Sequence, residues 1–148
     1  MIYLGSDHAG FELKEVIKNY LKEQGKEAED LGAFELNEED DYPDFITPVA
    51  KKVAQDPEQN RGIVLGGSGQ GEAIAANRFK GVRAAVYYGG SLDIVKLSRQ
   101  HNNANILSLG ARFLTKEQAI EAVDLWLKTP FEAGKHDRRI KKIESDSD

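Results

Sequence analysis

Gly66-Gly67-Ser68-Gly69-Gln70-Gly71-Glu72 follows the apolar run 63–65 and leads into the helix-prone segment 73–77. A strand that passes through a glycine-rich turn into a helix lets backbone N–H groups approach an anion closely, and the helix dipole adds partial positive charge there. Glu72 lies where the turn meets the helix. A carboxylate that can take a proton is thus expected beside donors that can hold the negative charge left behind. The turn predicts an anion site with Glu72 as the candidate base.

The turn alone leaves a structural interpretation open. It lacks the Lys-Ser/Thr ending of a P-loop, and its glycines do not have the spacing of a Rossmann dinucleotide fingerprint. It could be only a tight connection, and Glu72 could be a first-turn glutamate that complements the helix dipole. Because the chain contains no cysteine, any mechanism that needs a thiol base or nucleophile is excluded.

Strands alternate with helices along the whole chain. Short apolar runs predict five strands, and helical patterns follow them; the runs are 2–4, 28–31, 62–65, 82–88 and 105–109. The alternation, without hairpin signals, predicts an α/β protein with a five-stranded parallel sheet between two helical layers, a three-layer Rossmann-like fold. Ligands bind such folds at the carboxyl ends of the strands, where Asp7-His8, the glycine turn and Arg112 would emerge.

Three local signals bear on where the helices begin and end. Thr115 and Gln118 have the spacing of a capping box, which predicts a helix start. Gly25 is a candidate C-cap for the first helix. Pro48 is tolerated only near the first turns of the helix that carries residues 45–53, so the start of that helix stays open.

Length and composition favour a single soluble globular domain. At 148 residues, with 40% hydrophobic and 30% charged residues, the chain is expected to form one domain over 1–143 with a disordered tail over 144–148. No apolar run could span a bilayer and nothing resembles a signal peptide, so a cytoplasmic protein without a membrane partner is expected. The net charge of -5 argues against general nucleic-acid binding, although it leaves room for a local basic site.

The run 135–142 is strongly basic, in contrast to the negative net charge of the whole chain. On composition it is a solvated helix face, but Lys135 and Arg139 are four residues apart and could present two cations to one phosphate. Nucleic-acid contact is the rival, although the run is short and has no interleaved aromatic residues. His8 and His101 lie among small polar residues, where a surface position stays open. The histidine spacing fits no zinc site, so no metal is expected.

Several motifs in a fixed order identify a family. They are Ser6-Asp7-His8-Ala9-Gly10, Asp41-Tyr42-Pro43-Asp44, the glycine turn, Ile74-Ala75-Ala76-Asn77-Arg78, His101-Asn102-Asn103-Ala104-Asn105 and Leu109-Gly110-Ala111-Arg112. Together they resemble the ribose/galactose isomerase family over essentially the whole chain. The resemblance implies a cytoplasmic aldose-ketose isomerase without a cofactor, which interconverts ribose 5-phosphate and ribulose 5-phosphate in the pentose phosphate pathway. It also implies a homodimer with shared active sites and a C-terminal helix that reaches the partner subunit, and it leaves open whether dimers pair into tetramers.

The resemblance also assigns roles to residues. Many members have a cysteine base just before the glycine turn, where this chain has Gly66, and a second subgroup has a glutamate after the turn, here Glu72. Ser68 and His101 would be catalytic with Glu72, and His101 would help to open the furanose ring from the partner subunit. The implied substrate-binding residues are Asp7, His8, Gly67, Ser68, Gly69, Gln70, Gly71, Asn102, Arg112, Lys135 and Arg139. The family often has arginine in place of Lys135, and lysine offers a point charge instead of a bidentate fork.

Two alternatives remain at this stage. One is an isomerase of another phosphorylated sugar, such as galactose 6-phosphate, allose 6-phosphate or a tetrose phosphate. The other is a non-catalytic phosphosugar-binding protein on the same fold. Glu72 and His101 argue against the second, because binding alone needs neither a base nor an acid.

Overall fold

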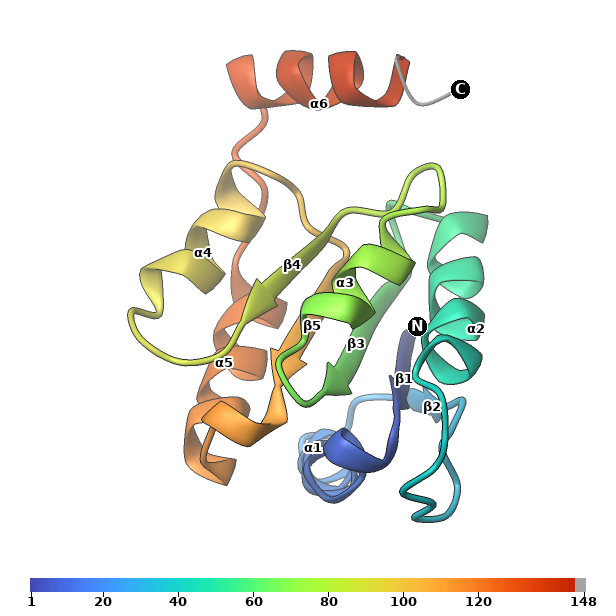
Figure 1. The fold of residues 1–148 in the computed structure, drawn as a ribbon. Helices are drawn as coiled ribbons and strands as arrows, with labels where there is room; N and C mark the ends of the chain where they lie inside the picture. Colours follow the sequence, from blue (N-terminus) through green and yellow to red (C-terminus); the bar gives the residue numbers. More distant parts are fainter. Residues whose placement is uncertain (146–148) are drawn as a thin grey trace.

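The strands form a single parallel sheet, as the sequence predicts. The computed structural model describes residues 1–145, and within them the sheet has five strands in the order β2-β1-β3-β5-β4 (Figure 1). The strands are β1 (Ile2–Ser6), β2 (Ala28–Asp30), β3 (Arg61–Gly66), β4 (Ala84–Tyr87) and β5 (Ile106–Gly110). Their positions agree with the predicted runs to within two residues at each end. The order places the carboxyl ends of β1, β3 and β5 side by side.

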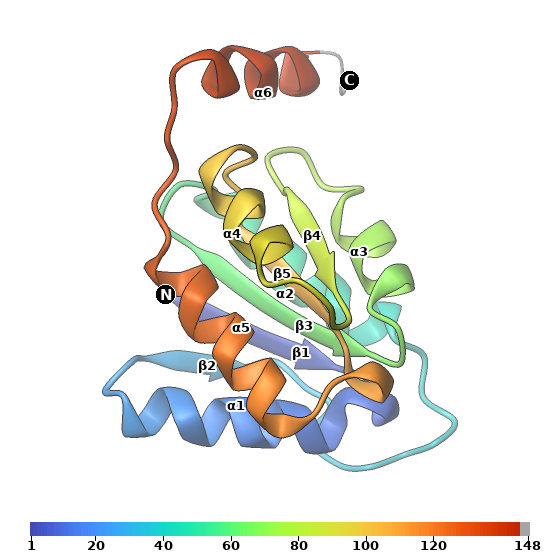
Figure 2. The same ribbon diagram turned by 90° about the vertical axis from the view of Figure 1, so that its left-hand side faces the viewer.

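Helices cover both faces of the sheet, which confirms the three-layer α/β/α fold. The helices are α1 (Phe11–Glu23), α2 (Pro43–Gln55), α3 (Gln70–Ala76), α4 (Asp93–Gln100), α5 (Lys116–Lys128) and α6 (Lys135–Ser145), with short 3-10 helices η1 (His8–Gly10) and η2 (Ala111–Phe113). One layer consists of α1, α4 and α5, and the other of α2 and α3 (Figures 1 and 2). None of these helices within residues 1–145 is long and apolar enough to cross a membrane.

The central strand β3 links the two halves of the core. Ile63 and Leu65 pack on the side of α1 and α5, around the buried Trp126. Val64 points to the opposite side, among the buried residues of α2 and α3. A parallel strand that is covered on both faces has to be apolar on both, which is why this run is continuous instead of alternating.

The capping box at the start of α5 is confirmed, and the end of α1 differs from the prediction by one residue. The Thr115 side chain accepts from the Gln118 N–H at 3.1 Å, and the Gln118 side chain accepts from the Thr115 N–H at 2.8 Å, which completes the capping box. The C-cap of α1 is Gln24, one residue before the predicted Gly25, and Gly25 comes next with a φ of +70°, the left-handed conformation that glycine adopts readily. The start of α2, which the sequence left undecided, is at Pro43, and Pro48 lies in the second turn of this helix.

The C-terminal helix extends further than the sequence suggests. α6 continues to Ser145, so the expectation of a disordered tail from residue 144 does not hold for Glu144 and Ser145; residues 146–148 lie outside the described part. The physical reason is a tertiary ion pair, because Glu144 Oε1 lies 3.0 Å from Arg83 Nη1. The Gly81 N–H donates to the same carboxylate at 3.2 Å. Composition alone cannot reveal such a contact.

Candidate active site

The carboxyl ends of three neighbouring strands bring one group of predicted site residues together. We call it the carboxyl-end cluster; its members are Asp7, His8, the turn Gly67–Gly71, Glu72 and Arg112. Asp7 and His8 follow β1, the turn and Glu72 follow β3, and Arg112 follows β5. The Arg112 N–H donates to Gly67 O at 3.1 Å, and a Cβ added to Gly67 would lie 3.1 Å from Arg112 Nη1. Residues up to 105 positions apart in sequence thus line one end of the sheet, as predicted.

Glu72 is buried behind the glycine turn. Only 4% of the surface of Glu72 is exposed, and its carboxylate fills the space that a Cβ on Gly66 would occupy. Burial is the main cause that raises the pKa of Glu72, and the charge of Asp7 raises it further, while a hydrogen bond from its own backbone N–H lowers it. A first-turn glutamate that only complements the helix dipole would sit in solvent. Glu72 instead has the environment of a carboxylate adapted to take up a proton.

The glycine turn is held against β5 by contacts that a larger residue would prevent. Gly69 is the N-cap of α3 with a φ of +80°, and its carbonyl accepts from Ser108 Oγ at 2.6 Å. A Cβ on Gly110 would come within 2.6 Å of Ser68 O. Ser68 Oγ accepts from the Gln70 N–H at 3.3 Å. These contacts fix the turn at the N-terminus of α3, where backbone N–H groups lack helical acceptors and favour an anion.

Asp7 and His8 have different local roles. Asp7 Oδ1 accepts from the N–H groups of Ala9 and Gly10 at 3.0 and 3.3 Å, so it caps η1. His8 is held from outside its own segment, because its ring Nδ1 lies 2.7 Å from Asp40 Oδ1. That hydrogen bond is the largest cause that raises the pKa of His8; Asp7 raises it as well, whereas partial burial and Arg112 lower it.

A second group lies at the other end of the sheet. We call it the amino-end cluster; its members are His101, Asn102, Lys135 and Arg139. His101 is the C-cap of α4, which runs back from the carboxyl end, and β5 begins five residues after it. Lys135 and Arg139 are exposed on α6, which lies beyond the amino ends of the strands (Figures 1 and 2). Within one chain, therefore, the structure does not bring His101 to Glu72.

His101 has two neighbours that carry ionisable groups. Its ring stacks on that of His136, with centroids 4.1 Å apart and planes 12° from parallel. Its Nε2 lies 3.7 Å from Glu132 Oε1. Burial lowers the pKa of His136 most, with further lowering by His101 and the cations of α6. The stacked pair places two imidazoles at the start of α6, beside Lys135.

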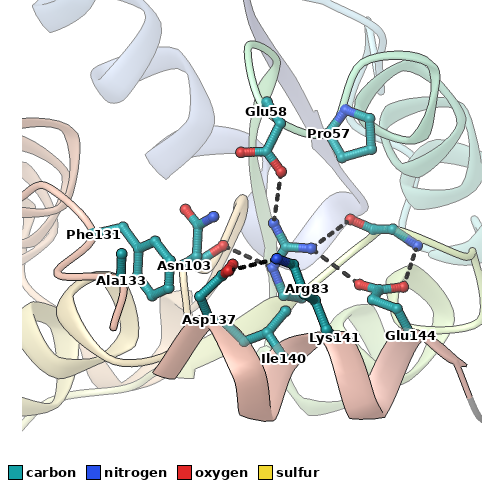
Figure 3. A pocket seen from close by; sticks show the side chains of 11 residues that line it. Pro57, Glu58, Arg83, Asn103, Phe131, Ala133, Asp137, Ile140, Lys141 and Glu144 are labelled. Atoms are coloured by element: carbon teal, nitrogen blue, oxygen red, sulfur yellow. Dashed lines mark hydrogen bonds and ion pairs between the residues drawn. The ribbon is translucent and has the colours of Figure 1, made fainter. Parts of the chain in front are cut away.

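Charged side chains that pair with one another line the groove between α6 and the domain. Figure 3 shows Arg83 at its centre, donating to Asn103 O at 2.9 Å and pairing with Glu144 at 3.0 Å, while Glu58 lies 4.0 Å away. Lys141 pairs with Asp137 at 2.8 Å on the helix itself. Because each cation here has an acidic partner, the groove holds α6 in place and is not a free anion site.

Two residues of interest were missed by the sequence interpretation. Asp40 lies in the acidic stretch 38–41, where composition suggests a solvated loop, and nothing in its spacing connects it to His8. His136 lies within the basic run 135–142, where the sequence gives it no role of its own. The one signal in the sequence is that the chain has only three histidines. The stacking of His136 on His101 could not be predicted, because it depends on how the segment 129–134 folds back.

Two groups in the described residues have the composition of a metal site, namely His101, Glu132, His136 and Asp7, His8, Asp40. Imidazole lone pairs lie in the ring plane, so two rings stacked nearly parallel do not converge on one ion. In the second group, Asp7 Oδ1 is taken by the cap of η1 and His8 Nδ1 by Asp40. The geometry of the side chains favours neither site.

Known proteins resemble this chain in sequence and in fold. The family model described as Ribose/Galactose Isomerase matches residues 2–143. A relative from Mycolicibacterium paratuberculosis, named ribose-5-phosphate isomerase B, is 46% identical over 94% of this chain and 86% of its own length. A crystal structure of ribose-5-phosphate isomerase B from Mycoplasma genitalium with bound ribulose-5-phosphate superposes with a TM-score of 0.94 at 44% identity, covering 97% of this chain and 93% of that one. The enzyme from Thermotoga maritima gives a TM-score of 0.89 at 46% identity, with 97% of both chains covered.

Proposed function

The chain belongs to the ribose/galactose isomerase family, and on that premise we propose that it interconverts ribose 5-phosphate and ribulose 5-phosphate. The neighbouring structure from Mycoplasma genitalium, which holds ribulose-5-phosphate, supports this choice of sugar. The observation that carries the proposal is the buried Glu72 carboxylate in the space beside Gly66, with the glycine turn next to it. The proposal includes a catalytic base, which a binding protein would not need.

The chemistry needs one base that moves one proton. In the open-chain aldose, Glu72 removes the proton from C2, and the C2–H electron pair forms the double bond of an enediolate while the carbonyl oxygen takes up negative charge. The same carboxyl group then returns the proton to C1, while the C2 hydroxyl loses its proton to become the ketose carbonyl and the oxygen on C1 takes up a proton to become a hydroxyl. A carboxylate with a raised pKa suits this task better than a solvated glutamate, because proton transfer from a weak carbon acid needs a stronger base.

The glycine turn would stabilise the enediolate. Its N–H groups are fixed before the reaction by the contacts of Gly69 and Ser68, so they need no reorganisation as charge develops. Asp7, His8 and Arg112 would bind the sugar or its phosphate from the ends of β1 and β5. Binding the phosphate supplies remote binding energy that holds the reacting carbons beside Glu72.

We further propose a cytoplasmic homodimer in which each site takes one cluster from each copy. The separation of His101 and Glu72 within one chain supports this, since a ring-opening acid has to reach the same sugar as the base. The partner copy would supply His101 as that acid, Asn102 beside it, and Lys135 and Arg139 for the phosphate. His136, stacked on His101, would enter the site with it.

The test is ketose formation from aldose phosphates of four, five and six carbons, with wild-type protein and Glu72→Gln side by side. We expect turnover to be highest on ribose 5-phosphate and to fall about 100- to 10,000-fold in Glu72→Gln, the range typical of a lost general base. Exchange of the C2 proton with deuterated solvent should disappear in the same variant.

The other results would each change a different part of the proposal. Turnover that peaks on another sugar would keep the mechanism and change the substrate. Near-normal activity of Glu72→Gln would remove Glu72 as the base. Binding of sugar phosphates without turnover or deuterium exchange would favour the non-catalytic alternative.

A further inference from the structure

Asp40 reaches into the carboxyl-end cluster from a loop that the sequence does not connect with it. Its Oδ1 accepts from the His8 backbone N–H at 3.1 Å and lies 2.7 Å from His8 Nδ1. The Asp40 side chain is 7% exposed and that of His8 is 27% exposed. One carboxylate oxygen thus contacts both the backbone and the ring of a residue 32 positions away.

The loop that carries Asp40 is anchored firmly at its base. The Ser6 N–H donates to Gly32 O and the Ala33 N–H donates to Ser6 O, both at 2.8 Å, which ties the loop to the end of β1 just before His8. Lys14 is fully buried below it and pairs with Asp30 at 2.7 Å. The base of the loop is thus fixed to the end of β1, two residues before His8, and the contact between Asp40 and His8 is part of the packed structure.

The contact dictates which ring nitrogen of His8 carries the proton. An ionised carboxylate only accepts hydrogen bonds, so Nδ1 has to be the donor. In neutral His8 the lone pair is then on Nε2, the atom remote from Asp40, and in protonated His8 this atom becomes a donor as well. The charged groups that face His8 are Asp40, Asp7 and Arg112, and on balance the pKa of His8 is raised.

The second oxygen of Asp40 argues against a purely stabilising role. Asp40 Oδ2 is buried and has no hydrogen-bond partner among residues 1–145. A buried carboxylate oxygen without a partner is unfavourable for folding. Within the described part of the chain, only Oδ1 of this carboxylate has hydrogen-bond partners, and both of them belong to His8. Such a pattern is expected where a residue is kept to orient a functional group.

We infer that Asp40 is a positioning residue, which holds the His8 ring with Nδ1–H donating to its carboxylate, so that the protonated ring presents its Nε2–H to the anionic group of the substrate beside Arg112. The inference deepens the proposed function and rests on it for the identity of that anionic group. It adds Asp40 to the residues on which substrate affinity depends, although Asp40 itself touches no substrate. His8 and Arg112 would form a pair of donors at the ends of adjacent loops, one oriented by a carboxylate.

The experiment compares Asp40→Asn with Asp40→Glu, and uses Glu39→Gln, an exposed residue of the same loop, as the matched control. Ring ¹⁵N NMR reads the tautomer and the pKa of His8 directly, because the chain has only three histidines and the signal is assigned with His8→Gln. We expect the Nδ1–H tautomer in the wild type. In Asp40→Asn we expect mixed tautomers and a lower pKa of His8, with the His101 and His136 signals unchanged as a check on the fold.

The kinetic readout separates positioning from general damage. KM for the sugar phosphate should rise about tenfold in Asp40→Asn, as for the loss of one charge-assisted hydrogen bond, while kcat changes less than about twofold. Asp40→Glu should recover part of the affinity, and Glu39→Gln should match the wild type. An Nε2–H tautomer in the wild type, or an unchanged tautomer and KM in Asp40→Asn, would overturn the inference.

The NMR measurement also distinguishes this inference from the proposed function. Inorganic phosphate, added without any sugar, should shift the His8 Nε2 signal of the wild type at lower concentration than that of Asp40→Asn. If no sugar phosphate is turned over while this difference persists, the proposed function fails and the positioning role stands. If turnover is normal and the phosphate response is the same in both proteins, the positioning role fails alone.

Discussion

The two ends of the sheet differ in how firmly they hold their functional residues. At the carboxyl end, Glu72 is buried and the glycine turn is locked against β5. At the amino end, His101 is half-buried, and Lys135 and Arg139 are exposed on α6, which the segment 129–134 joins to α5 (Figure 2). On the proposed function, the base and the anion hole would be complete within one chain, whereas the acid and the phosphate-binding cations would acquire their surroundings from another copy.

The largest effect is expected where the carboxyl-end cluster is most tightly packed. In Gly66→Ala the new Cβ overlaps the Glu72 carboxylate, which is the far end of a flexible side chain and can move away. We therefore expect a folded protein whose turnover falls about 100-fold or more, as for loss of a general base. Steady-state kinetics and circular dichroism measure the two properties.

A double-mutant cycle checks the cause. If the loss in Gly66→Ala comes from displacing the base, adding Gly66→Ala to Glu72→Gln should lower the residual turnover little further. Multiplicative losses in the double variant would mean that Gly66 acts through something other than Glu72.

Mixing two inactive variants tests whether the two ends belong to one site. If sites are shared, mixed dimers of Glu72→Gln and His101→Asn contain one intact site and one site with both changes. After subunits are exchanged, activity should return to about a quarter of the wild-type value, because about half of the dimers are mixed and half of their sites are intact. Activity is measured before and after unfolding and refolding the mixture.

The matched control for that mixture uses two changes at the same end. Glu72→Gln mixed with Gly66→Ala leaves every site with one defective carboxyl-end cluster, so no activity should return. Recovery in this control as well, or none in the first mixture, would contradict a site made from both ends of the sheet in two copies.

The same comparison explains how far the sequence could lead. The alternation of strands and helices, the Thr115 capping box and the strand ends at Asp7, Glu72 and Arg112 follow from local patterns, and the structure agrees with each. The depth at which Glu72 is buried could not be predicted, because it depends on the space left beside Gly66. Asp40 was missed for a similar reason, since its contact with His8 is produced by a loop anchored through Ser6 and Lys14.

A smaller effect is expected on stability, and it depends on pH. The folded protein holds the Glu72 proton more tightly than an unfolded chain does, because burial raises the pKa above the ordinary value of 4.5. Stability is therefore lost as pH rises from about this ordinary value through the folded pKa, and above the folded pKa the wild type bears the full penalty of the buried charge. Glu72→Gln has no such charge.

Thermal unfolding across pH measures this difference. At pH 7, Glu72→Gln should melt at a higher temperature than the wild type, because it buries no charge at this position. The advantage should vanish below the ordinary glutamate pKa, where both side chains are neutral. A variant that is less stable at pH 7, or an advantage that grows in acid, would show that the Glu72 carboxylate is stabilised where it lies.

The smallest effect concerns the attachment of α6. Glu144 pairs with Arg83 at 3.0 Å, with side chains 27% and 13% exposed, so Glu144→Ala should loosen the last turn of the helix. Because α6 carries Lys135 and Arg139, we expect KM for the sugar phosphate to rise about threefold with kcat unchanged, consistent with a partly screened ion pair. Lys141→Gln breaks only the exposed pair with Asp137 and is the matched control, with no change expected. An equal rise in KM in both variants would point to the net charge of α6 rather than its attachment, and a fall in kcat alone would separate α6 from the binding of phosphate.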